Sequence, residues 1–161
     1  MPLKYAYHPG NVSHSSAPEV NDTVIPLARS LNIELIPLEG ATSCGAGIVR
    51  QANKRLQLTL NARTFAMAET LGLDIMTPCA TPSGNLNEDL HTLNNDPILL
   101  AEVNTVLQKT CGLQFNGSIS VHHLLHVLVD EVGLDKVTKA VKNPINFNIA
   151  GYYGPNMQQS G

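Results

Sequence analysis

Two cysteines lie in glycine-rich turns where thiol or metal chemistry is feasible. Cys44 stands in the segment Ala-Thr-Ser-Cys-Gly-Ala-Gly at 41–47, and Cys79 stands in Thr-Pro-Cys-Ala-Thr-Pro-Ser-Gly at 77–84. Each turn precedes a helical pattern, and a helix N-terminus lowers the pKa of a nearby thiol. The residues alone therefore allow three interpretations: a redox-active pair, a pair of metal ligands, or inert thiols that pack as small apolar side chains.

The elements that must position these turns are strands alternating with helices. Apolar runs at Leu3–Tyr7, Ile33–Leu38 and Leu73–Met76 predict three strands, and apolar positions at helical spacing from Ile48 to Leu71 predict one long helix. This alternation favours the α/β class, with a small parallel sheet flanked by helices. The turns after parallel strands meet at one edge of the sheet, where open α/β sheets bind ligands. We therefore expect the turn at His8–Asn11 to join the two cysteine turns there.

The last third of the chain predicts helices and one further strand. Ser120 is a good cap, and the apolar positions from 121 to 132 form one stripe of a predicted helix. His122 and His126 would lie one turn apart on that helix. Two imidazoles at this spacing can bind zinc, although a solvated polar face is the simpler interpretation. The segment Ile145–Tyr153 alternates between apolar and other residues and predicts a final strand.

The composition excludes several classes of protein. The chain has 161 residues, a formal net charge of −3 and no Trp, which argues against nucleic acid as a partner. Its three cysteines are an odd number at irregular spacing, unlike a secreted disulfide framework. It shows neither a signal-peptide pattern nor an apolar run of about 20 residues that could span a bilayer. These features predict a cytoplasmic domain without a transmembrane segment.

The three turns together resemble the cysteine-rich CCG domain found in the B subunit of heterodisulfide reductase and in succinate dehydrogenase E-type subunits. Tyr5–Asn11 is similar to the opening of that domain, Thr42–Gly47 to its Cys-Cys-Gly centre, and Cys79–Gly84 to its Cys-x-x-Cys-x-Gly end. The spacing also matches, because 31 residues separate position 11 from position 43 and 34 separate position 44 from position 79. The resemblance implies one CCG-type half-domain.

The same resemblance implies a ligand set of which this chain keeps only part. In the family, five cysteines hold a non-cubane iron–sulfur cluster or, in some N-terminal domains, zinc. The corresponding positions here are Asn11, Ser43, Cys44, Cys79 and Pro82. Iron–sulfur clusters normally use about four thiolates, so we expect no cluster and no other cofactor. A zinc ion bound by Cys44 and Cys79 is the alternative, since structural zinc accepts two cysteines and two histidines.

Two histidines flank the first turn and are the candidates to complete such a zinc site. They are His8 and His14, and a role as ordinary loop residues is the simpler interpretation for both. The remaining cysteine, Cys111, follows a helical pattern and is expected to pack. The Gly-rich segment 41–47 lacks the Lys-Ser/Thr of a phosphate-binding loop, so nucleotide binding is not expected.

The resemblance also suggests how the chain is divided and what it does. Residues 1–150 are expected to form the CCG-type domain, and 151–161 a tail or the start of a truncated second repeat, because Tyr152–Pro155 resembles a second opening motif. The implied function is a subunit or domain of a heterodisulfide reductase B-like or succinate dehydrogenase-associated oxidoreductase, of electron-transfer ancestry and structural in role. The alternatives are a thiol-redox or zinc-binding module that uses Cys44 and Cys79, and an interaction domain without any electron-transfer role.

The expected partners follow from the same resemblance. They are flavin or iron–sulfur subunits of an oxidoreductase, through which the chain could lie at a membrane surface, or a second copy of the chain. For the second case, the segment that ends at Tyr152 and Tyr153 is the predicted contact, because an uncovered apolar surface is expected there.

Overall fold

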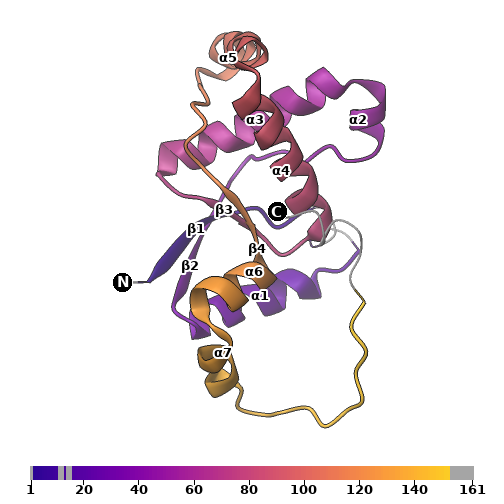
Figure 1. The fold of residues 1–161 in the computed structure, drawn as a ribbon, viewed down its shortest axis with the longest axis vertical. Helices are drawn as coiled ribbons and strands as arrows, with labels where there is room; N and C mark the ends of the chain where they lie inside the picture. The colour runs from indigo at the N-terminus through magenta and orange to yellow at the C-terminus, as the bar shows by residue number, and fades with distance from the viewer. Residues whose placement is uncertain (1, 11–12, 14–15, 153–161) are drawn as a thin grey trace.

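A four-stranded sheet forms the centre of the computed structural model, which describes residues 2–10, 13 and 16–152. The strands lie in the order β2-β1-β3-β4, and every neighbouring pair is parallel. Their bounds are Leu3–Tyr7 for β1, Ile33–Pro37 for β2, Ile75–Thr77 for β3 and Val121–His123 for β4. The predicted α/β class with a small parallel sheet is therefore confirmed (Figure 1).

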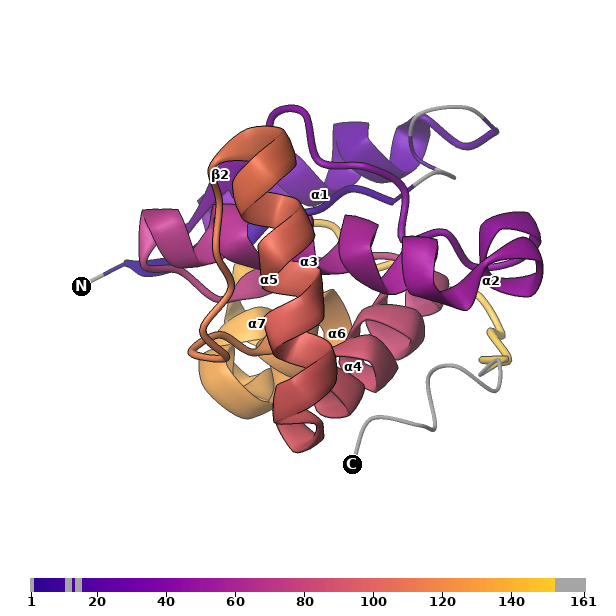
Figure 2. The same cartoon turned by 90° about the horizontal axis from the view of Figure 1, so that it is seen from above.

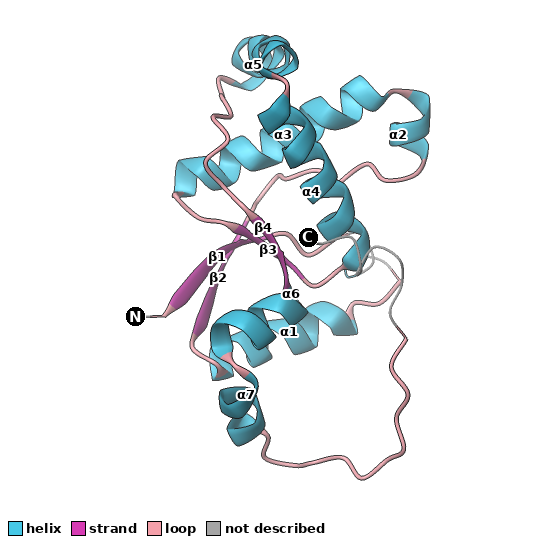
Figure 3. Cartoon of the chain, viewed as in Figure 1, coloured by secondary structure: helices cyan, strands magenta, loops and turns pink. Residues whose placement is uncertain are grey.

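The helices form one layer on each face of the sheet (Figures 1 and 3). The first layer contains α3 (Lys54–Leu71), α4 (Ala80–Asn95) and α5 (Pro97–Cys111), and the short α2 (Ile48–Ala52) lies beside it. The second contains α1 (Glu19–Ser30), α6 (Leu124–His126), the π-helix η2 (Val127–Val132) and α7 (Leu134–Ala140).

Alternation along the strands divides the buried side chains between the two layers. Ala6 and Ile75 pack with α3, α4 and α5, while Tyr5, Tyr7 and Met76 pack with α1 and the 124–127 region. Successive side chains of a strand point to opposite faces, so a central strand of a covered sheet must be apolar at every position. The uninterrupted apolar character of 5–7 and 75–76 follows from that requirement.

The predicted helix over 120–132 is wrong at its first residues. Val121–His123 is instead strand β4, in register with β3 through Ile75↔Val121 and Thr77↔His123. Helical structure begins only at Leu124, where the backbone N–H of Leu125 donates to the Nδ1 of His123 at 3.1 Å. The backbone of 121–123 is more favourably placed as the fourth strand, because it satisfies the open side of β3.

The long helix predicted from Ile48 to Leu71 is divided at Asn53. This residue has extended backbone angles (φ −158°, ψ 91°), and its side chain accepts a hydrogen bond from the N–H of Leu56 at 2.9 Å. Asn is among the best N-cap residues, so it starts α3 afresh instead of continuing α2.

The predicted strand at Ile145–Tyr153 does not pair with the sheet. Residues 145–152 are exposed and belong to no strand, and Tyr153 lies outside the described residues. Figure 1 shows this stretch leaving α7 and running clear of the sheet. Alternation supplies one apolar face, but a strand also needs a neighbour for its backbone groups.

Candidate functional site

The turns that follow β1, β2 and β3 contact one another at the carboxyl edge of the sheet. The Nε2 of His8, in the first turn, lies 3.1 Å from the carbonyl oxygen of Thr42 in the second. Gly10 lies against the third, since an added Cβ there would be 2.9 Å from the Cβ of Cys79 and 3.3 Å from the Cγ of Pro82. Only glycine tolerates both this approach and the positive φ of 79° at position 10.

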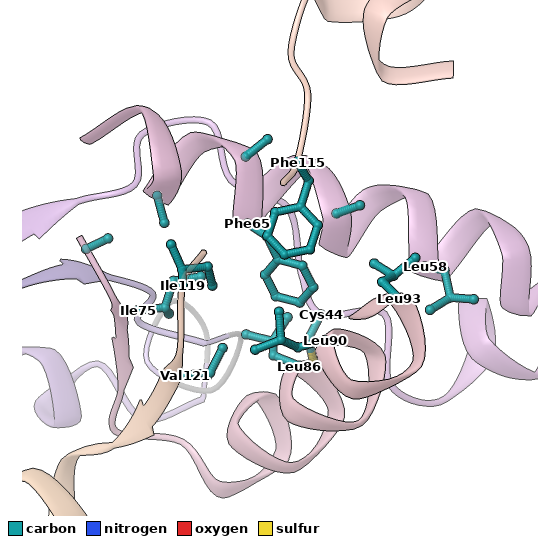
Figure 4. Packing of buried hydrophobic residues seen from close by; sticks show 14 of the residues in the cluster. Cys44, Leu58, Phe65, Ile75, Leu86, Leu90, Leu93, Phe115, Ile119 and Val121 are labelled. Carbon is teal, nitrogen blue, oxygen red and sulfur yellow. The ribbon is translucent and has the colours of Figure 1, made fainter. Parts of the chain in front are cut away.

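Cys44 is buried in the apolar cluster between α3 and α4. Figure 4 shows its side chain beside Leu86 and Leu90. Burial raises the pKa of the Cys44 thiol, the N–H of Ala46 offsets part of that rise, and the nearby Cys79 raises the pKa further. The expectation of a thiol activated by a helix N-terminus is therefore wrong for Cys44, because desolvation outweighs the favourable backbone contact.

Cys79 is half-buried at the N-cap of α4. Its backbone N–H donates to the hydroxyl of Thr77 at 3.3 Å, and neither it nor Cys44 is in a disulfide. The residue before it, Pro78, accepts a hydrogen bond at 3.1 Å from the Nε2 of His123. Because the Nδ1 of His123 accepts from a backbone N–H, Nε2 must carry the proton. Burial lowers the pKa of His123, which keeps this ring neutral.

The other predicted ligand positions offer little to a metal. The hydroxyl of Ser43 accepts a hydrogen bond from the N–H of Gly45 at 3.2 Å. Pro82 is buried in the first turn of α4, where its ring is tolerated and carries no donor atom. Asn11 and His14 lie outside the described residues.

The donor set does not fit an iron–sulfur cluster, which normally takes about four thiolates. Two of the five positions carry a thiol, one a hydroxyl, one an amide and one a proline ring. Over residues 2–10, 13 and 16–152, no three His, Cys, Asp or Glu side chains are grouped to hold a metal ion. His8, the described candidate for a zinc site, has its Nε2 at the Thr42 carbonyl.

A buried carboxylate that the sequence did not single out lies beneath the Cys44 turn. The side chain of Asp89 has no exposed surface, and it accepts hydrogen bonds from Lys54 Nζ at 2.5 Å, Gln57 Nε2 at 2.6 Å and Asn61 Nδ2 at 2.6 Å. These three donors come from α3 and the acceptor from α4. The carboxylate therefore joins the two helices that enclose Cys44.

The amides of Gln57 and Asn61, together with that of Asn85, also bind the backbone of Cys44. Its carbonyl oxygen lies within hydrogen-bond distance of Asn85 Nδ2 (2.6 Å), Asn61 Nδ2 (3.0 Å) and Gln57 Nε2 (3.3 Å). We call Gln57, Asn61, Asn85 and Asp89 the Cys44 bracket. Their helical spacing was the available signal: Gln57 and Asn61 are four apart, as are Asn85 and Asp89, so each pair shares one helix face.

The two histidines predicted on one helix lie on different elements. His122 is in β4, with its Nε2 3.6 Å from Asp74 Oδ2 and its Nδ1 3.8 Å from Glu131 Oε1, whereas His126 ends α6. They therefore do not present the i, i+4 pair that the helical pattern predicted.

Comparison with known sequences identifies a family and several relatives. The sequence model of the CCG family, described as a cysteine-rich domain, matches residues 5–87. The B subunit of the ferredoxin/F(420)H(2)-dependent CoB-CoM heterodisulfide reductase of Methanosarcina acetivorans is 31% identical over 127 residues, which are 78% of this chain and 42% of the relative. A protein of Archaeoglobus profundus described as like the B subunit of heterodisulfide reductase is 30% identical over 141 residues, 87% of this chain and 47% of the relative.

A further relative comes from a bacterium. The 8-methylmenaquinol:fumarate reductase membrane anchor subunit of Wolinella succinogenes is 30% identical over 155 residues, 96% of this chain and 53% of the relative. The chain thus spans about half the length of these relatives. In the part of the chain that the structure describes, no helix has both the length and the apolar character needed to cross a bilayer.

Proposed function

Because the chain belongs to the CCG cysteine-rich domain family, we propose that it is a subunit, or a domain of one, in a heterodisulfide reductase B-like or succinate dehydrogenase-associated oxidoreductase. Its role there is structural, and it holds no iron–sulfur cluster. Its partners are flavin or iron–sulfur subunits, through which it lies at a membrane surface. The relatives, each of which is a reductase subunit or is described as like one, support this assignment.

One observation carries the structural role. Two positions that correspond to the family's ligands hold side chains packed against the rest of the domain. Cys44 lies inside an apolar cluster, and Pro82 is buried with its ring close to Gly10. The three amides of the Cys44 bracket donate to the carbonyl of Cys44, which stabilises the turn without any metal. Such a site keeps the shape of the edge and supplies a surface for a partner.

The decisive experiment combines metal analysis with identification of partners. The tagged full chain is purified without oxygen from its native host, and iron, zinc and acid-labile sulfide are measured beside the visible spectrum. We expect substoichiometric metal, no thiolate-to-iron charge-transfer absorption, and copurified flavin or iron–sulfur subunits. Stoichiometric iron with sulfide would refute the absence of a cluster, and a chain recovered without such subunits would refute the role in a complex.

A variant with restored ligands provides the matched positive control. Substituting Asn11→Cys, Ser43→Cys and Pro82→Cys together returns five thiols to the family positions. Iron incorporation by this variant and not by the wild-type chain would show that the missing thiolates, and not a collapsed edge, prevent cluster binding. If the variant folds but takes up no iron, the geometry of the edge, and not only the missing thiolates, prevents cluster binding.

A second candidate, a thiol-redox or zinc-binding module, is favoured by one observation. Cys79 lies close enough to Cys44 for a Cys79 thiolate to raise the pKa of the Cys44 thiol, and neither cysteine is in a disulfide. Zinc titration of the wild-type chain against a Cys44→Ser/Cys79→Ser variant separates this function from the first. Zinc bound at one ion per chain and lost in the variant would favour the module, while equal weak binding by both would exclude it.

A further inference from the structure

The outer edge of β2 is open. The N–H of Leu38 donates to the carbonyl of Tyr7 at 3.1 Å, so the even-numbered residues of this strand face β1. The backbone N–H and C=O groups of Ile33 and Leu35 and the carbonyl of Pro37 therefore point away from the sheet, and no described residue pairs with those of Leu35. The opposite edge differs, because Asn87 Nδ2 covers the carbonyl of Val121 in β4 at 3.1 Å.

A groove runs along this open edge beside α1. A hollow of about 370 Å³ at the carboxyl end of β2 is lined by residues that include Ile25, Pro37 and Thr42. A second, of about 350 Å³ at the amino end, is lined by Ile25 together with residues that include Ile33 and Leu35. Ile25, 41% exposed, lines both hollows, so the two lie next to each other along the edge, and together we call them the groove. The buried hydroxyl of Thr42 has no hydrogen-bond partner among the described residues.

A strand edge beside a helix is a recurring site for an extended peptide. The peptide adds as one more strand through its backbone, and its alternate side chains enter the groove. The open edge of β2 would gain backbone partners in this way, and the apolar surface of Ile25 would be covered. The groove therefore fits an extended segment with an apolar residue at every second position.

The chain itself contains a segment of that kind, residues 142–152, which we call the C-terminal segment. All of its residues are exposed, and Ile145, Phe147 and Ile149 alternate with 68%, 78% and 76% of their surface accessible. Figure 2 shows the end of this stretch, in yellow next to the grey trace, far from the β2 label. A monomer rarely leaves so much apolar surface uncovered.

We propose that the C-terminal segment of one copy adds as a strand to the β2 edge of a second copy, and that two copies exchange segments to form a two-fold dimer. Lys136 Nζ lies 3.3 Å from the carbonyl of Leu31, so α7, from which the segment leaves, is anchored beside the start of β2. The origin of one segment and the groove for the other are thus close together on each copy. Reciprocal exchange of an identical element is a low-cost route to such dimers.

Charge and area are consistent with this occupant. The C-terminal segment contains one lysine, Lys142, and no acidic side chain, and Glu39 lines the hollow at the carboxyl end of β2. At the amino end, Glu34 pairs with Lys4 at 2.6 Å, so its charge is already balanced. Each segment brings two isoleucines and two aromatic rings, and an aromatic side chain buries roughly 150 Å² or more. Two segments therefore bury on the order of 1,000 Å², the lower bound for a specific interface.

The primary test measures the mass of the full chain in solution by light scattering across the micromolar range. We expect twice the 17.3 kDa of one chain for the wild type, and a monomer for the double variant Phe147→Ser/Ile149→Ser. The matched control, Asn146→Ser/Asn148→Ser, changes the other face of the same segment and should remain dimeric. All four positions are exposed outside the fold, so neither variant should unfold the domain.

A wild-type chain that is monomeric throughout this range would overturn the proposal. A monomer is the expected result if the segment instead pairs with the β2 edge of its own chain or binds another protein. Equal loss of the dimer in both double variants would also overturn it, because the contact would then not follow strand alternation.

Backbone pairing is tested with a peptide of residues 142–152 added to the monomeric double variant, whose groove is empty. The unmodified peptide should bind. Two peptides, N-methylated at position 147 or at position 148, are then compared. One of them should bind at least tenfold more weakly than the unmodified peptide and the other within twofold of it, because only alternate amides face β2. Equal effects at the two amides, or no binding of the unmodified peptide, would refute strand addition.

Discussion

Replacing Asp89 with asparagine should destabilise the domain by about 3 kcal/mol, although the two side chains have nearly the same shape. The carboxylate accepts three hydrogen bonds and has no exposed surface. Gln57 and Asn61 both donate to Oδ2, and Lys54 donates to Oδ1. The introduced amide can place its oxygen at the Oδ2 position, but both bonds then lose their charged acceptor and its own N–H groups face the ammonium of Lys54. The amides of Gln57 and Asn61 cannot rotate to improve these bonds without releasing the Cys44 carbonyl, which their N–H groups also contact.

The magnitude follows from the types of bond that are lost. A hydrogen bond to a charged group contributes about 1.5–3 kcal/mol, and two amide bonds of this kind are weakened. The Lys54 ion pair adds little, because the lysine side chain is 38% exposed and water can solvate its ammonium after the substitution. The full loss of about 3–5 kcal/mol for breaking a buried pair is therefore an upper bound.

Urea denaturation measures this loss. With a slope of about 2 kcal/mol per molar urea, the midpoint should fall by about 1.5 M. Glu88→Gln is the matched control, since Glu88 is the exposed neighbour that pairs with Arg50 at 2.6 Å, and it should lose at most about 1 kcal/mol. Equal midpoints for the two variants would refute the argument that the buried carboxylate holds α3 to α4.

Three further predictions concern the edge and its neighbours. Gly10→Ala should lower the free energy of unfolding by about 3 kcal/mol, measured by thermal or urea unfolding, and Gly112→Ala by only about 1 kcal/mol. Both glycines have positive φ, but of the two only position 10 has neighbouring atoms that an added Cβ would meet. Similar losses for the two variants would contradict the close packing at Gly10. Cys111 is exposed and should react quickly with a thiol reagent, whereas Cys44, whose pKa burial raises, should react more slowly and only at higher pH. A Cys111→Ser chain that still shows a fast thiol at position 44, identified by mass spectrometry, would contradict the burial of Cys44. Burial raises the pKa of Tyr7 to about 12, so the folded state favours the neutral phenol and loses stability as pH rises from about 10 towards 12. In a titration followed by phenolate absorbance, the Tyr7→Phe variant should lack one of the groups that titrate late in the wild-type chain.

The strands and helices that the sequence predicted correctly have clear local boundaries. Leu3–Tyr7 is an apolar run ended by Pro9 and Gly10, and it forms β1 with the predicted bounds. The 121–132 region lacked such a boundary, because its apolar positions suit a buried strand end as well as a helix stripe. A three-residue strand such as β4 exists only because β3 offers an open side, and that information is not local.

The cysteine turns were predictable from spacing, whereas the Cys44 bracket was not identified. The contact of the first turn with Cys79 at Gly10 follows from parallel neighbouring strands. The bracket depends on how α3 and α4 are rotated about their own axes, which decides whether Gln57 and Asp89 meet or face water. The polar spacing of each helix was visible, but their relative rotation is set by packing around Phe65 and Leu86 in the core.

The strand order has a consequence for how the chain folds during synthesis. The central strand, β1, is made first, and its partner β2 follows about thirty positions later, so this pair can form early. Its other neighbour, β3, pairs Ile75 with Ala6 and must wait for far more of the chain. The last strand closes β3 only after α4 and α5 have been made. Pairings so distant in sequence are slow to form, and a nascent chain that pauses before Val121 leaves one side of β3 open to other chains.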